Sequence, residues 1–268
     1  MSIPQNLNQF ATLVDIIAKL RAPDGCPWDR QQSHASLREN LLEECYEVLE
    51  ALDNSDLRKL CDELGDLLMQ VVLHAQIATE AGEFKLEDVL SNINAKLIHR
   101  HPHVFGSLKV KDADEVAHNW EVLKQEERPP HTPILASVPK QMPALGYSRE
   151  IQRRAAWVGF DWEDVDGIID KLVEEVREFK QADILEQREG EFGDLLFTLV
   201  NIARRLGIDS EVALREANQR FYRRFTYMEE VCRQRGVSLS QLSFDEQNAL
   251  WAEAKKKIRE LKSGREDI

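Results

Sequence analysis

The chain carries one polar pattern twice, and this repeat constrains its fold more than any other feature. The first copy reads Glu43-Glu44-Cys45-Tyr46-Glu47 and later Glu63-Leu64-Gly65-Asp66, and the second reads Glu174-Glu175-Val176-Arg177-Glu178 and later Glu191-Phe192-Gly193-Asp194. Two leucines follow each copy. Core packing would make apolar residues recur, but the residues that recur here are polar, so core packing cannot explain them. The sequence therefore predicts a duplicated unit.

The repeat continues downstream in basic and aromatic residues. Asn94, Lys96 and Arg100 are spaced as Asn218, Arg220 and Arg224 are, and Trp120 with Lys124 matches Trp251 with Lys255. The separation between matching positions changes little along the chain, so the two copies are expected to differ mainly in their loops.

Each copy is expected to be helical. From Leu37 to Leu52, and again from Leu57 to Val72, apolar residues recur at the spacing of one helix face. The polar run from Asp53 to Asp56 between these stripes is typical of a turn. Two helices joined by so short a turn pack antiparallel. We expect an all-α protein.

A proline-rich segment divides the chain. Five of the nine prolines fall within 15 residues, at positions 129, 130, 133, 139 and 143. Prolines disfavour helix and extend the chain. The predicted organisation is a helical module at 1–127, a linker at 128–147 and a second module at 148–268.

The acidic motifs favour a metal site in each copy. Residues three apart share a helix face, so Glu44 with Glu47, and Glu63 with Asp66, can converge across the antiparallel pair. Crowded carboxylates stay ionised only beside a cation, and hard oxygen ligands suit Mg²⁺ or Mn²⁺. A lone E-x-x-E is usually solvated surface, but its recurrence favours metal. The predicted ligands are Glu44, Glu47, Glu63, Asp66, Glu175, Glu178, Glu191 and Asp194.

Other residues suggest a phosphate ligand. Lys171 precedes Glu175 by one turn, Arg220 and Arg224 are one turn apart, and Lys255 follows Trp251 by one turn. Cations near a metal-carboxylate centre can hold phosphate oxygens. The alternatives are a surface ladder of Arg220 and Arg224 with Glu216, and core packing of Trp251. The glycine in each E-x-x-D, costly within a helix, suggests close approach to the facing helix or to a ligand.

Composition excludes several classes of function. A net charge of −13 disfavours binding to nucleic-acid polymers or anionic membranes. No membrane-length apolar run or leader pattern is seen, so a cytoplasmic protein is expected. The four cysteines lack the paired spacing of a zinc site, no P-loop occurs, and only Glu115 with His118 fits a di-iron motif.

Together the motifs resemble the MazG family of nucleoside triphosphate pyrophosphohydrolases. The likeness also includes the segments 25–29 (GCPWD), 101–105 (HPHVF) and 158–162 (VGFDW), and it spans nearly the whole chain. The resemblance implies tandem MazG-like helical modules that form four-helix bundles completed by dimerisation. It also implies Mg²⁺-dependent cleavage of a nucleoside triphosphate between the α and β phosphates, with metal ligands at the eight acidic positions above.

The second copy is expected to be the main catalytic unit, since Lys171 stands where the first copy has Asn40. Glu174, with its counterpart Glu43, is a candidate general base, and Lys171 a second candidate catalytic residue. Substrate contacts are expected from Lys171, Asn218, Arg220, Arg224, Trp251 and Lys255. The alternatives are a module that senses nucleotides without turnover and a purely structural helical protein.

Overall fold

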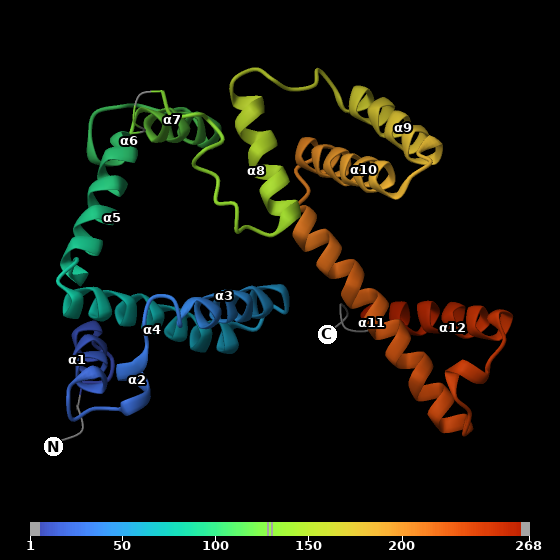
Figure 1. Ribbon diagram of the computed structural model, residues 1–268, viewed down its shortest axis with the longest axis horizontal. Helices are drawn as coiled ribbons and strands as arrows, with labels where there is room; N and C mark the ends of the chain where they lie inside the picture. The colour runs from blue at the N-terminus through green and yellow to red at the C-terminus, as the bar shows by residue number, and fades with distance from the viewer. Residues whose placement is uncertain (1–5, 128, 130, 264–268) are drawn as a thin grey trace. The chain divides into compact units, whose positions relative to one another are not determined.

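A computed structural model describes residues 6–127, 129 and 131–263, and all regular structure in them is helical (Figure 1). The all-α prediction is confirmed. The chain divides into two compact units, Met1–Pro129 and Pro130–Ile268, and the division falls inside the proline-rich segment. Residues 1–5, Arg128 and Pro130 of the predicted linker, and residues 264–268 of the second module lie outside the described part. None of the described helices combines the length and the hydropathy of a membrane span.

The N-terminal unit contains seven described helices. They are α1 (Phe10–Arg21), α2 (Pro27–Gln31), α3 (Arg38–Asp53), α4 (Leu57–Ala81), α5 (Leu86–Arg100), α6 (Pro102–Phe105) and α7 (Ala113–Glu126). The long helix α4 packs against α3 and α1. Its core joins Ile17 of α1 and Leu37 to Val72, Leu73 and Ile77 of α4.

The turn between α3 and α4 forms as its polar residues predict. The Asp56 carboxylate accepts hydrogen bonds from the backbone N–H groups of Arg58 and Lys59, which caps α4. Gly82, in the left-handed conformation with φ of 72°, ends the same helix. This short connection holds α3 antiparallel to α4 and fixes which faces of the two helices meet.

The C-terminal unit repeats the antiparallel pair. Its helices are α8 (Ala144–Trp157), α9 (Val165–Gln181), α10 (Leu185–Arg205), α11 (Ser210–Arg235) and α12 (Phe244–Ser263), with a 3₁₀ turn η1 (Leu239–Gln241). Helix α10 packs against α9 and α8, and α12 packs against α11. Asp164 and Asp209 cap α9 and α11 as Asp56 caps α4.

Both helix pairs leave large apolar side chains exposed. On α9 and α10 these include Ile169, Val173, Phe192, Leu196 and Leu199. On α3 and α4 they include Leu42, Tyr46, Leu49, Leu64 and Leu68. Residues of this kind are normally buried, and contiguous apolar surface marks a place where another surface binds. Each pair therefore presents an apolar face that the described part of its own unit does not cover.

Candidate active site

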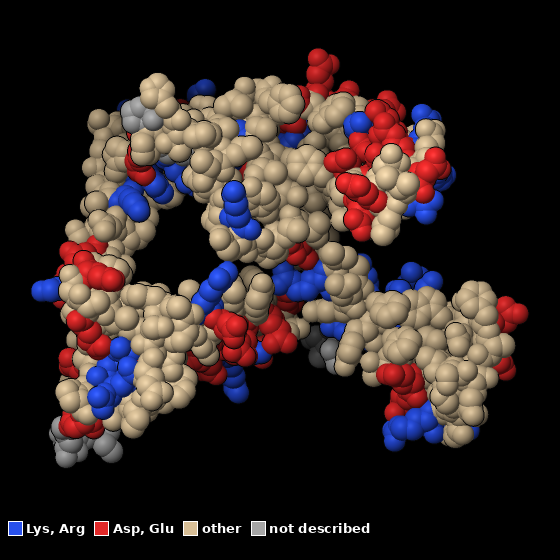
Figure 2. All heavy atoms as spheres, viewed as in Figure 1, with Lys and Arg blue, Asp and Glu red and all other residues tan. Residues whose placement is uncertain are grey.

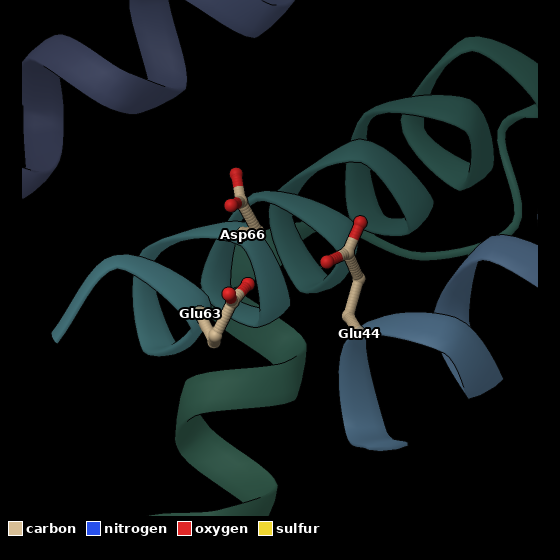
Figure 3. A group of neighbouring side chains, drawn as sticks. All are labelled: Glu44, Glu63 and Asp66. Atoms are coloured by element: carbon tan, nitrogen blue, oxygen red, sulfur yellow. The ribbon is translucent and has the colours of Figure 1, made fainter. Parts of the chain in front are cut away.

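The acidic motifs of the N-terminal unit meet between α3 and α4. One carboxylate oxygen from each of Glu44, Glu63 and Asp66 lies within 4.8 Å of the other two. Figure 3 shows Glu44 extending from α3 and the other two from α4. Glu47 is near enough to act on the cluster, because burial first and the charge of Glu47 second raise the pKa of Glu63.

The C-terminal unit builds the same cluster from α9 and α10. Glu175, Glu178 and Glu191 each place one carboxylate oxygen within 4.8 Å of the others. Glu175 is buried, with 4% of its surface exposed. The pKa of Glu191 is raised by burial and then by the charges of Glu178, Glu175 and Asp194. Asp194 is itself exposed beside the cluster, and Figure 2 shows acidic side chains crowded over this helix pair.

Both clusters suit a small divalent cation. Three carboxylates that crowd together repel each other, as the raised pKa values of Glu44 and Glu191 show. Burial contributes most to the rise at Glu44, followed by the charge of Asp66. A hard cation such as Mg²⁺ or Mn²⁺ would remove the repulsion and accept these oxygens as ligands.

Lys171 belongs to the C-terminal carboxylate cluster. Its ammonium nitrogen lies 2.8 Å from a carboxylate oxygen of Glu174 and 2.8 Å from one of Glu175. The hydrogen bonds to Glu174 and Glu175 raise the pKa of Lys171, so it stays positively charged. The matching position in the N-terminal unit holds Asn40, which brings no charge. The two clusters thus differ by one fixed cation.

The remaining predicted basic residues gather in a second group on α11 and α12. The Arg224 guanidinium lies 5.6 Å, and the Lys255 ammonium 5.9 Å, from the centre of the Trp251 ring. Trp251 also packs 5.3 Å from the Phe221 ring and against the core of that helix pair. Its packing favours a role in holding the two cations over a role in stacking on a base.

Arg220 and Asn218 are less closely tied to this group. Arg220 hydrogen-bonds Glu216 one turn earlier, at 3.3 Å, which is the surface-ladder alternative. Asn218 is exposed on α11. Within the described residues, α12 and η1 pack on α11, and α11 packs on α8 and α10 but not on α9. Among the described residues, no ion pair or hydrogen bond joins this basic group to the carboxylate cluster of the same chain.

The N-terminal counterpart of the basic group is neutralised. Arg100 lies 5.4 Å from the centre of the Trp120 ring, as Arg224 lies over Trp251. Unlike Arg224, Arg100 forms a bidentate ion pair with Glu127, in which Nε donates to Oε1 at 3.0 Å and Nη2 donates to Oε2. The Nε atom of Arg224 is buried without a hydrogen-bond partner among the described residues. Of the two arginines, Arg224 is the better placed to accept an anion from outside.

The motif glycines do not touch the facing helix. A methyl group placed on Gly65 or on Gly193 would meet no atom within 4 Å. The suggestion that these glycines permit close helix packing is therefore wrong within the described part of the chain. Open space beside the acidic residues leaves the other reading, approach to a ligand.

The sequence did not indicate a cavity at the edge of the C-terminal pair. It lies between α8, α10 and the loop after α8, and its lining includes Gln152 and Asn201. Its one sequence signal is Asn201, seven residues after Asp194, where the first copy has Leu73 seven residues after Asp66.

A family model and the similar proteins of known name point to the same protein family. Residues 32–105 match the model of the MazG nucleotide pyrophosphohydrolase domain. The chain is 45% identical over 248 residues to the nucleoside triphosphate pyrophosphohydrolase/pyrophosphatase MazG of Thermotoga maritima, covering 92% of this chain and 95% of that protein. It is 40% identical to the Escherichia coli K12 nucleoside triphosphate pyrophosphohydrolase, covering 95% and 100%. It is 46% identical to the uncharacterized protein YabN of Bacillus subtilis, covering 94% and 53%.

Proposed function

This chain belongs to the MazG family and is a hydrolase of phosphoric anhydrides, and we propose that it cleaves nucleoside triphosphates between the α and β phosphates with the help of Mg²⁺. The products would be a nucleoside monophosphate and pyrophosphate. The observation that carries the proposal is the convergence of Glu175, Glu178 and Glu191 across α9 and α10. This oxygen-rich, negatively charged site binds phosphate only when cations reverse its charge.

The residues of the C-terminal cluster would have three roles, which are to bind metal, to accept a proton and to contact phosphate. Glu175, Glu178, Glu191 and Asp194 would hold Mg²⁺, which when bound neutralises the triphosphate and lowers the pKa of a coordinated water. Glu174 is about half exposed and would accept the proton of the attacking water. Lys171 donates a hydrogen bond to Glu174 at 2.8 Å and can also contact a phosphate oxygen.

We assign the main activity to the C-terminal unit. Lys171 supplies a cation that the N-terminal cluster lacks. Arg224 has no carboxylate partner among the described residues, whereas Arg100 is held by Glu127. The four free cysteines and a nucleotide substrate both suit the cytoplasm, which cell fractionation would test.

Product identification tests the reaction. Purified protein with Mg²⁺ should convert ATP to AMP and pyrophosphate, resolved by ³¹P NMR. Formation of ADP and inorganic phosphate would contradict the proposed cleavage site. Mg²⁺-dependent nucleotide binding without any product would replace the enzyme with a nucleotide sensor.

We further propose that the active form is a homodimer in which a second copy brings basic residues to each carboxylate cluster. Two observations support this. The α9–α10 pair exposes apolar side chains such as Phe192 and Leu199. The Arg224 group does not pack on the carboxylate-bearing α9 of its own chain. A self-complementary interface would cover the apolar faces and complete the site at once.

Mixing two inactive variants tests this arrangement. Glu175→Gln removes a metal ligand and Arg224→Ala removes a phosphate contact, so each homodimer should be inactive. If the two residues act across the dimer, an equal mixture after subunit exchange should recover about a quarter of wild-type activity, from one intact site in half of the dimers. Dimers that exchange subunits without any recovery would place both residues of each site in one chain.

A further inference from the structure

The cavity of the C-terminal unit has the size and lining of a small-molecule site. Its volume is about 680 Å³, inside the range of roughly 300–1,000 Å³ that such sites occupy. Ala155 of α8, Trp162 of the following loop and Phe197 of α10 contribute apolar surface to its wall. A pocket with this lining favours a flat, partly apolar group over a free phosphate.

Two side-chain amides in the cavity wall have unused hydrogen-bonding capacity. Gln152 is 7% exposed, and its Nε2 donates to the backbone carbonyl of Phe197 at 2.9 Å. Its Oε1 is buried without a partner among the described residues. The Oδ1 of Asn201 accepts from Nη2 and Nε of Arg204 at 2.7 and 3.2 Å, and no described group pairs with its Nδ2. An acceptor and a donor are therefore available to a ligand, and a buried acceptor left unpaired is unfavourable.

The cavity lies along α10, the helix that carries two of the candidate metal ligands, Glu191 and Asp194. Asp194 and Asn201 are seven residues apart on α10, which places them on one face and about 10 Å apart along the axis. That is about the length of a nucleoside. A nucleotide with its phosphates at Glu191 and Asp194 would therefore place its other end near Asn201.

The N-terminal unit has core in place of this cavity. Leu73, which corresponds to Asn201, is 4% exposed and belongs to the core cluster with Ile17 and Leu37. The two units therefore differ within the carboxylate cluster, at Lys171, and also next to it, at Asn201 and the cavity. This second difference supports a ligand role for the C-terminal cavity, because a duplicated structural core would need no amide there.

We propose that this cavity binds the base and ribose of the nucleotide whose phosphates bind at the α9–α10 carboxylates, an inference that rests on the proposed function. The Gln152 carbonyl accepts an N–H from the base edge, and the Asn201 amide donates to a neighbouring ring or carbonyl acceptor. Every common base presents an adjacent donor and acceptor on that edge, so the two amides admit purines and pyrimidines alike. Apolar contact with Phe197 and Trp162 supplies the rest of the binding.

Two variants test the cavity by different means. Asn201→Leu installs the residue of the first copy and removes the donor, while Ala155→Phe fills the space. Each should raise the KM for ATP and the dissociation constant of AMP about tenfold or more. The inhibition constant of inorganic tripolyphosphate, which has no nucleoside, should stay within about twofold of wild type because the phosphate end is untouched. Thermal melting of each variant checks that it is folded.

The AMP titration keeps this inference separate from the proposed reaction. Calorimetric binding of AMP to wild type requires no turnover, so loss of binding in folded Ala155→Phe supports the cavity even if ATP is not cleaved to AMP. An unchanged KM for ATP and unchanged AMP binding in both folded variants would overturn it. A parallel change in the tripolyphosphate constant would also overturn it, because the effect would then lie at the phosphate site.

Discussion

Replacing Glu175 with glutamine should lower kcat for ATP about a thousandfold, whereas the same change at Glu44 should leave most of the activity. Glutamine keeps the shape of the buried side chain but removes the negative charge that would bind Mg²⁺. A metal centre supplies several kcal/mol of transition-state stabilisation, and each 1.4 kcal/mol lost is tenfold in rate. Glu44 sits at the matching place in a unit that has Asn40 instead of Lys171. Steady-state release of pyrophosphate measures both variants.

The pair of variants is its own control. Both positions lie on the first helix of an antiparallel pair and join a three-carboxylate cluster. Circular dichroism and gel filtration would show that each variant keeps its fold and assembly. Full activity in Glu175→Gln together with inactivity in Glu44→Gln would move the catalytic centre to the N-terminal unit.

Removal of divalent cations with EDTA should abolish hydrolysis, and Mg²⁺ or Mn²⁺ should restore it. The same titration should stabilise the protein, because bound metal relieves the repulsion among carboxylates. At a hundredfold excess over the dissociation constant, binding contributes about 2.7 kcal/mol. For a unit of this size that corresponds to a rise in Tm of about 5–10 °C. Full hydrolysis in EDTA would contradict the metal proposal.

The raised pKa of Glu191 predicts how the stability of the metal-free protein changes with pH and on substitution of this residue. Burial and neighbouring carboxylates raise it in the folded state. In the absence of metal, its protonated form therefore favours folding below its ordinary range of about 4.5, and this contribution is lost as pH rises through the raised value. At neutral pH in EDTA, Glu191→Gln should melt higher than wild type. It should also show a smaller Mg²⁺ response, the remainder coming from the N-terminal cluster.

The sequence predicts the carboxylate clusters because local rules alone determine them. Spacing of three residues aligns Glu175 with Glu178 on one helix face. A short connection then folds the next helix back, as the turn capped by Asp56 does in the first copy. One such pair of like charges is usually solvated surface, but the recurrence of both pairs after the proline-rich segment makes a chance arrangement improbable.

The sequence did not predict the separation of the basic group from the carboxylates. Arg224 and Glu175 are both repeated, which suggested one site, but the path of the long helix α11 after Gly207 depends on tertiary packing. The cavity was missed for a related reason. Apolar residues such as Phe197 have the same periodicity whether they fill a core or line an open space, so only the partly buried Asn201 distinguished the two.

The ion pair between Arg100 and Glu127 makes the two halves of the chain differ in how far they depend on a bound nucleotide. Glu127 gives Arg100 a built-in anion, which is what a nucleotide phosphate would offer the equivalent arginine in the other half. Because Glu127 already pairs with Arg100, we expect the N-terminal half to keep its architecture whether or not nucleotide is present. One half can then serve as permanent scaffold while the other remains dependent on, and responsive to, what it binds.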